Sequence, residues 1–274
     1  MTLAATTRSE TTKQFSTSAW WVLAIVLFVY IGFTAAVLGF VFSAASTGAL
    51  GSEAPQLPSE GLAETLYSTA TSVGYVFPLL IGTLMVTAEF RHSTLTPTFL
   101  ATPRRGNVLW AKLAVAVLLG LLYGLVGVIA SVAPSAAFLA GYGLSTEFDT
   151  VETWALFGRM LIAYVLWVLV GVGVGALVRN QVGAIVGVLV FTQFLEPVAR
   201  AAASFVDWLT EFTKYLPGAA SDALVGASVF TAGVPQGATA SDPLEWWAGG
   251  LVLLGYAAVF IVLGYLFSWR RDVS

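Results

Sequence analysis

The densest group of side chains that could act on another molecule lies in one short stretch, residues 89–112. This stretch reads EFRHSTLTPTFLATPRRGNVLWAK, and its ionisable members are Glu89, Arg91, His92, Arg104, Arg105 and Lys112. The apolar runs on either side, residues 69–88 and 113–133, contain no charged side chain. A connection this charged between two apolar runs is suited to contact with a partner in water.

The residues alone leave two interpretations of this stretch open. In the first, Glu89 and Arg91 form a surface ion pair that ends an apolar helix, and the cations at 104, 105 and 112 sit at the lipid headgroups. In the second, a short amphipathic helix lies between the two charged ends. Leu95, Phe99 and Leu100 have the spacing of one helix face, and Pro97 lies near a first turn. Such a helix is suited to docking in a groove of a soluble partner.

Residue types needed for catalysis or for metal binding do not converge in this sequence. There is one histidine, His92, and no cysteine, which removes thiol nucleophiles, disulfides and thiolate metal sites. An enzyme working inside a membrane would need a Ser/His pair, two aspartates or a His/Glu set within its apolar segments. We therefore expect no catalytic residues and no metal, and we interpret His92 as a solvated loop residue.

The glycine-rich run from Gly171 to Gly175 does not predict a nucleotide site. It lies inside an apolar segment without a preceding strand, and the P-loop pattern G-x-x-x-x-G-K-[ST] occurs nowhere in the chain. Any energy from ATP must therefore come through another subunit. Glycines four residues apart instead predict close helix packing. These pairs are Gly120/Gly124, Gly171/Gly175 and Gly183/Gly187.

Composition places the chain in a membrane. Of its 274 residues 58% are hydrophobic and 10% are charged, with a mean hydropathy of +0.86, which excludes an ordinary soluble core. The net charge of −3 shows no basic excess, so we expect no nucleic acid partner.

Hydropathy predicts an all-α polytopic protein with one transmembrane domain, residues 19–274, after a cytoplasmic or interfacial segment, residues 1–18. We expect the first residues to be disordered, the alternative being a short helix that lies on the membrane surface. The six predicted spans cover about residues 19–42, 69–88, 108–133, 154–178, 182–195 and 246–269.

Irregularities are expected at four places along these spans. Pro78 predicts a kink in the second span, and Pro134 a bend or an end in the third. The short turn around Asn180 predicts that the fourth and fifth spans are antiparallel neighbours. After the fifth span, residues 201–215 read as an outer amphipathic helix, followed by a loop to Glu245.

The distribution of charge predicts the orientation. Nine of the 12 Lys and Arg residues lie on the side of the two termini, whereas the other loops are acidic. The positive-inside rule then places both termini and residues 89–112 in the cytoplasm. We expect a multi-pass protein of the cytoplasmic (plasma) membrane.

One carboxylate, Glu196, lies deep in a predicted span. Arg200 follows it by one helical turn, so a structural ion pair between the two is expected. The alternative is that Glu196 lines an exit path, because charges are retained inside membranes where they function.

The motif in residues 89–112 resembles a known connection. Glu89-Phe90-Arg91-His92-Ser93-Thr94, then Pro103-Arg104-Arg105 and Ala111-Lys112, is similar to the loop between helices 2 and 3 of type-2 ABC exporter permeases, in their small bacterial form without a fused ATPase. The family pattern is E-[FY]-R-x-G-T, a turn rich in threonine and leucine, P-R-R and a closing A-K. Ser93 stands where glycine is usual.

This resemblance implies a function. The loop would hold a coupling helix that docks on a separate ATP-binding subunit, and the outer segment after helix 5 would resemble the family's re-entrant helices. Two such ATPases, which hold ATP and Mg, would drive two permeases, the second being a copy or a paralogue, with no cofactor on this chain. The implied coupling residues are Glu89, Phe90, Arg91, His92, Leu95, Phe99, Arg104 and Arg105. The implied substrate-path residues are Tyr75, Phe77, Gln193, Phe194 and Glu196.

A second hypothesis belongs to another class of protein. The same loop would serve a non-transporting membrane protein, an assembly or immunity factor that binds a cytoplasmic partner through residues 89–112. The two hypotheses differ in whether that partner hydrolyses ATP.

Overall fold

The computed structural model describes residues 2–51, 57–94, 98, 105–178, 180–203, 205–231 and 244–269, and in these residues it contains helices and no strands. Six helical segments are long and apolar enough to cross a membrane, which fits a multi-pass membrane protein. They are Ala19–Ser46, Leu62–Arg91, Gly106–Gly141, Val151–Leu177, Gln181–Ala203 and Trp246–Phe267. The predicted all-α class and the six apolar helices are confirmed.

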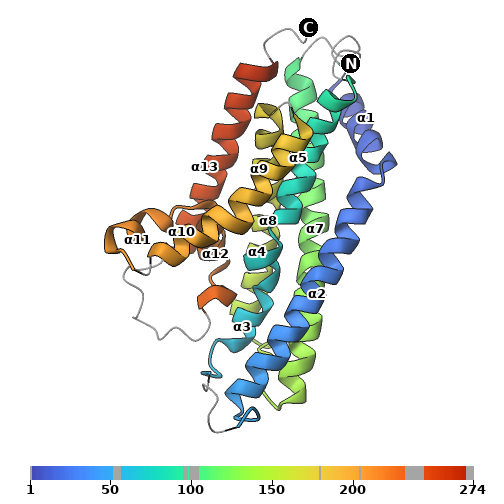
Figure 1. Cartoon of the computed structure of the whole chain (residues 1–274). Helices are drawn as coiled ribbons and strands as arrows, with labels where there is room; N and C mark the ends of the chain where they lie inside the picture. Colours follow the sequence, from blue (N-terminus) through green and yellow to red (C-terminus); the bar gives the residue numbers. More distant parts are fainter. Residues whose placement is uncertain are drawn as a thin grey trace.

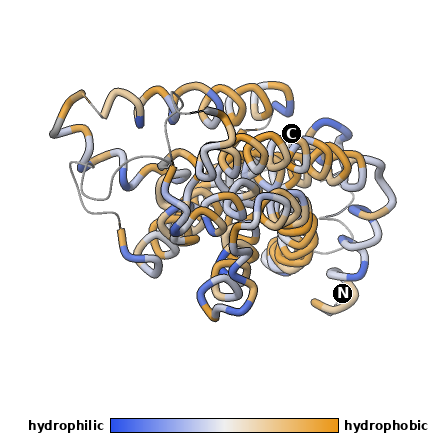
Figure 2. Tube along the Cα trace, turned by 90° about the horizontal axis from the view of Figure 1, so that it is seen from below, coloured by the Kyte–Doolittle hydropathy of each residue, from blue (hydrophilic) through white to orange (hydrophobic). Residues whose placement is uncertain are grey.

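The bundle is built around the helix α8 (Val151–Leu177). It packs against α5 (Val76–Arg91), α7 (Arg105–Gly141) and α13 (Trp246–Gly264), while α2 (Ala19–Ser46) packs on the far side of α7 (Figure 1). Trp167 and Tyr164 of α8 are fully buried in this centre. Outward-facing residues are apolar as well, and orange, the colour of hydrophobic residues, covers much of the tube in Figure 2. Such a surface is typical of contact with lipid or with other membrane helices.

The second span consists of three pieces: α3 (Leu62–Tyr67), α4 (Thr69–Gly74) and α5. The break between α4 and α5 falls at Tyr75, three residues before Pro78. Proline has no N–H for the carbonyl of Gly74, and its ring crowds that carbonyl. The kink predicted from Pro78 is therefore present as a break one turn earlier.

The third span does not end at Pro134. Helix α7 runs through this proline to Gly141, eight residues beyond the predicted end of the span at residue 133. One lost hydrogen bond is tolerated in an apolar helix that neighbouring helices hold in place.

Close glycine contacts hold α8 against its neighbours. A side chain at Gly171 would collide with the carbonyl oxygen of Leu79 in α5, and one at Gly120 would lie 2.5 Å from Cα of Val165. The packing predicted for Gly120/Gly124 and Gly171/Gly175 is thus confirmed. The prediction for the third pair is wrong within this chain, since nothing lies within 4 Å of the Cβ position of Gly187.

The fifth span is helical in a less regular way. The side-chain oxygen of Asn180 caps α9 (Gln181–Val190) by accepting the N–H of Gly183 at 2.9 Å. Helix α9 then packs against α5 more extensively than against α8. A π-helical turn, η1 (Phe191–Leu195), leads into α10 (Glu196–Ala203). Pro197, which cannot donate to the carbonyl of Gln193, follows this wide turn and explains why the regular α-helix is lost there.

Short helices replace the single amphipathic helix predicted for residues 201–215. After α10 come α11 (Asp207–Thr213), α12 (Pro217–Val225) and the 3-10 turn η2 (Val229–Thr231). In Figure 1, α10 and α11 project from one side of the bundle, and α12 returns to pack on α13 and α8. The loop expected after residue 215 thus contains the helix α12. A π-helical turn, η3 (Tyr265–Trp269), ends the described part of the sixth span.

The start of the chain is ordered, contrary to our expectation. Helix α1 (Leu3–Ser16) is capped by Thr2, whose hydroxyl accepts the N–H of Ala5. It packs against α7 at the end of the bundle where α5 ends and α7 begins, which we call the terminal end (Figure 1). The polar N-terminal residues are therefore ordered by tertiary contacts, not by their own helix propensity.

Candidate functional site

Four charged side chains meet at the terminal end. Lys112 Nζ lies 2.6 Å from Glu10 Oε2 and 3.0 Å from Glu89 Oε1. Lys13 Nζ lies 2.7 Å from Glu10 Oε1 and 3.1 Å from the same oxygen of Glu89. We call these four residues the ion cluster. Its two lysines and two glutamates balance in charge, and they tie α1, α5 and α7 together.

Burial makes the ion cluster different from a surface salt bridge. The side chains of Lys112 and Glu10 are 1% and 3% exposed. Burial alone would raise the pKa of Glu10, but attraction and hydrogen bonds from Lys112 and Lys13 outweigh it and hold this pKa below its ordinary value. Burial would likewise lower the pKa of Lys13, yet the hydrogen bond to Glu10 and the attraction of Glu89 raise it. The charges of Glu10 and Lys13 are therefore stabilised by their partners in the ion cluster.

The motif residues next to the ion cluster divide into buried and exposed ones. Glu89 is 7% exposed and points into the ion cluster, so it does not form the surface ion pair with Arg91 that we considered. Phe90 packs against the core. Arg91 and His92 are exposed, and Arg91 donates to Gln181 Oε1 at 3.4 Å. Among the described residues from Glu89 to His92, only this basic pair is exposed.

A tight turn ends α5 directly after this pair. Ser93 has a φ of 53°, in the left-handed region that favours glycine. The N–H of Thr94 donates to the carbonyl of Glu89 at 3.0 Å, the six-to-one hydrogen bond of a Schellman motif. Ser93 therefore adopts the conformation expected of the glycine that is usual at this position of the motif.

The rest of the predicted amphipathic helix is outside the described residues. This applies to Leu95, Phe99 and Arg104, and to the side chain of Arg105 at the start of α7. Thr98 is described, and its hydroxyl accepts a hydrogen bond from Lys13 Nζ at 3.1 Å.

A second candidate site is a pocket of about 370 Å³ between α4, the η1–α10 segment and η2. Of the predicted substrate-path residues, Tyr75, Gln193 and Glu196 line it. Phe77 instead packs against Tyr30 of α2, with ring centroids 5.9 Å apart. Phe194 is 63% exposed and does not line the pocket. The remaining lining residues are Ser72, Val73, Thr192, Pro197, Arg200, Ala201 and Phe230.

The ion pair predicted between Glu196 and Arg200 is wrong. Arg200 Nη2 lies 2.7 Å from Asp222 Oδ2 in α12. Glu196 is turned to the start of α12, where its Oε1 accepts the N–H of Ala219 at 3.0 Å. A Cβ at Gly218 would collide with Oε1 of Glu196, so a larger residue there would require this carboxylate to move. Glu196 thus stabilises the N-terminus of α12.

Sequence reasoning missed Asp222, although it joins α4, α10 and α12. Its two carboxylate oxygens accept hydrogen bonds from Ser72 at 3.0 Å and from Ser228 at 2.9 Å, besides that from Arg200. The available signal was one acid in a run of small and apolar residues, 217–225, which we interpreted as a loop.

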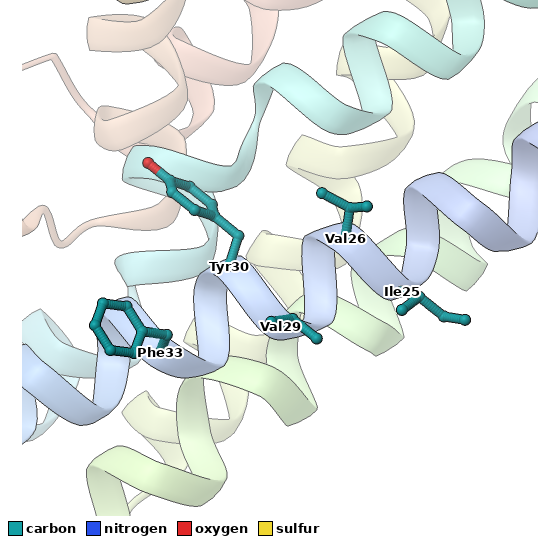
Figure 3. A pocket seen from close by; sticks show the side chains of 5 residues that line it. All are labelled: Ile25, Val26, Val29, Tyr30 and Phe33. Atoms are coloured by element: carbon teal, nitrogen blue, oxygen red, sulfur yellow. The ribbon is translucent and has the colours of Figure 1, made fainter.

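A second depression lies on the outer face of α2 and is lined by that helix alone. Ile25, Val26, Val29, Tyr30 and Phe33 form it, with a volume of about 420 Å³ (Figure 3). The tyrosine hydroxyl is its only polar side-chain group, so this depression resembles an ordinary lipid-facing surface and not a site of chemistry.

No group of three or more acidic or histidine side chains is placed to hold a metal ion in the part of the chain that the structure describes. Comparison with models of known protein families gave no match, and comparison with curated proteins gave none either.

Proposed function

We propose that this chain is the membrane-spanning subunit of an ATP-binding cassette exporter. In this proposal the chain lies in the plasma membrane and its terminal end faces the cytoplasm. A separate cytoplasmic subunit binds ATP and Mg. Two permease chains and two ATPases form the complex. The motif in residues 89–112 and the layout of six apolar helices support this proposal.

The observation that carries the proposal is the contrast between Glu89 and its neighbours. Arg91 and His92 are exposed at the end of α5, while Glu89, within one turn, is fixed in the ion cluster by lysines of α1 and α7. A partner that pushes on the basic pair therefore pushes on three helices at once. Buried charge pairs resist separation, because breaking one leaves an uncompensated charge. In this proposal Arg91 and His92 contact the ATPase and Glu89 positions them.

The test is purification of the tagged full chain from membranes of its native host after mild cross-linking. We expect a P-loop ATPase to co-purify and to hydrolyse ATP in the complex. Arg91→Gln should reduce both the recovery of the ATPase and its activity. Lys214→Gln is the matched control, since it removes a cation directly after α11, far from the terminal end in the fold.

The outcome that contradicts the proposal is a complex without any nucleotide-binding subunit. A stable cytoplasmic partner without ATPase activity would instead favour the assembly or immunity factor described above.

A further inference from the structure

The pocket beside α10 carries a negative charge that its own residues do not neutralise. Arg200 and Asp222 form an ion pair with each other. Glu196 forms no ion pair among the described residues. When all three side chains are ionised, one negative charge is left over, inside a segment apolar enough to cross a membrane. Uncompensated charge is costly there.

One oxygen of the Glu196 carboxylate is without a donor. Oε1 accepts the N–H of Ala219, whereas Oε2 is buried and has no hydrogen-bond partner in the described structure. The side chain is 1% exposed and forms part of the pocket wall. Capping of α12 therefore explains the position of Oε1 but leaves Oε2 without a hydrogen-bond donor. A buried acceptor without a donor is unfavourable, so a ligand that supplies an N–H group would be stabilised at this position.

The rest of the pocket selects the kind of ligand. Val73, Pro197 and Ala201 provide apolar wall, and Tyr75 and Phe230 provide aromatic rings. The volume of about 370 Å³ is far larger than a bare metal ion and matches a small organic group.

An anion would be disfavoured in the same pocket. The guanidinium of Arg200 already forms an ion pair with Asp222. It also lies 5.5 Å from the ring centroid of Phe230. A bound anion would have to replace Asp222 at Arg200 and would lie close to Glu196. The repulsion between the two anions would add to the cost of breaking the ion pair.

We infer that this pocket binds an organic ammonium group attached to an apolar or aromatic body, with Glu196 as its counter-ion. The ammonium N–H groups donate to Oε2 of Glu196, and the body lies against Phe230 and the apolar wall. Binding is a property of this chain alone. Identifying the ligand as the transported substrate rests on the proposed function, and the experiment below needs no ATPase, so the two can fail separately.

Three matched probes test the inference: 2-phenylethylammonium, 2-phenylethanol and phenylacetate. They share an aromatic ring and differ in charge. Saturation-transfer difference NMR is recorded on the full chain in lipid nanodiscs at neutral pH and constant sodium chloride, with empty nanodiscs as the blank. Only the ammonium probe should give a saturable signal.

Glu196→Gln keeps an oxygen for the N–H of Ala219 but removes the charge, and it should weaken binding of the ammonium probe by at least about tenfold. Glu211→Gln, at an exposed acid of α11, is the matched control and should bind as the wild type does.

Ala201→Trp fills the pocket without changing its charge, at an exposed position where folding should be retained, and it should also abolish binding. The inference is overturned if Glu196→Gln or Ala201→Trp binds the ammonium probe as the wild type does. It is equally overturned if phenylacetate binds as tightly as the ammonium probe, or if no probe gives a saturable signal.

Discussion

Lys112 donates to Glu10 across 2.6 Å in a salt bridge whose residues lie 102 positions apart in the sequence. Both side chains are nearly inaccessible to solvent, so neither charge is screened by water as a surface pair would be. Removing one partner therefore leaves a buried charge unpaired, whereas removing both does not. The pair thus tests whether α1 packs against α7 as described.

Lys112→Met should destabilise the protein by about 3 kcal/mol, because Glu10 and Glu89 would then share one cation. The free energy of unfolding can be followed in mixed detergent micelles. Adding Glu10→Gln to Lys112→Met restores the balance of charge, so the double variant should lose less than the sum of the two single losses. Arg8→Met, which removes an exposed cation of α1, is the control and should have little effect. Strict additivity would show that the two charges do not interact.

Glu10→Gln should also change how stability depends on pH. The pKa of Glu10 in the folded protein lies below its ordinary value of 4.5, so ionised Glu10 stabilises the fold at higher pH. This stability is present above about pH 4.5 and is lost as pH falls through the lowered pKa. The melting temperatures of wild type and Glu10→Gln should therefore differ at pH 7 and converge in acid.

Ser93→Gly should stabilise the end of α5 by about 1 kcal/mol. A left-handed φ destabilises an ordinary residue by roughly 1–2 kcal/mol, whereas glycine adopts it with little conformational penalty. Ser93 is exposed, and no other described feature depends on its side chain. Thr94→Gly, one residue later, is the comparison and should not stabilise. A destabilised Ser93→Gly variant would mean that the turn is not as described.

Two glycine positions should respond in opposite directions to alanine. Gly171→Ala forces α8 away from the carbonyl of Leu79 and should cost about 1–3 kcal/mol. Gly187→Ala meets no neighbouring atom and adds a better helix former, so it should be neutral or gain up to about 1 kcal/mol. If Gly187→Ala is as damaging as Gly171→Ala, a contact from another chain covers that face of α9.

Glu147, in the loop before α8, should make the protein less stable as the pH rises. Burial, a hydrogen bond with Glu64 and repulsion from Glu64, Asp149 and Glu60 raise its pKa to about 7. The folded state then holds a proton that the unfolded chain releases near pH 4.5, so stability declines between about pH 4.5 and pH 7. Glu147→Gln should melt at a higher temperature than the wild type at pH 8 and at the same temperature at pH 4. A constant difference would exclude this titration.

Apolar length was enough to predict five of the six spans, because a span needs about 20 apolar residues. The fifth, predicted over residues 182–195, continues as a helix to Ala203. Helix α8 begins and ends within three residues of the prediction. The contacts of charged side chains were not predictable in the same way. Lys112 stands at the edge of an apolar run, and its partner Glu10 could be identified only once α1 was placed beside α7.

Sequence spacing was misleading for Glu196. A separation of four residues allowed the pair with Arg200, yet the wide turn before α10 and the return of α12 bring Asp222 closer to that guanidinium. Local periodicity cannot show which distant segment supplies the better partner. The same reason explains why α12 and its Asp222 were missed: small residues predict a loop when no neighbour is known.

Helix α7 has 37 residues, which at about 1.5 Å each gives about 55 Å, well beyond the roughly 30 Å of a hydrocarbon core. Its tightest approach to α8, at Gly120 and Gly124, falls near its middle, and Lys112 lies near one end. If α7 tilts as a rigid rod about this contact, a tilt of about ten degrees moves each end by about 5 Å in opposite directions. A displacement of the ion cluster would then be accompanied by an opposite displacement of Tyr142.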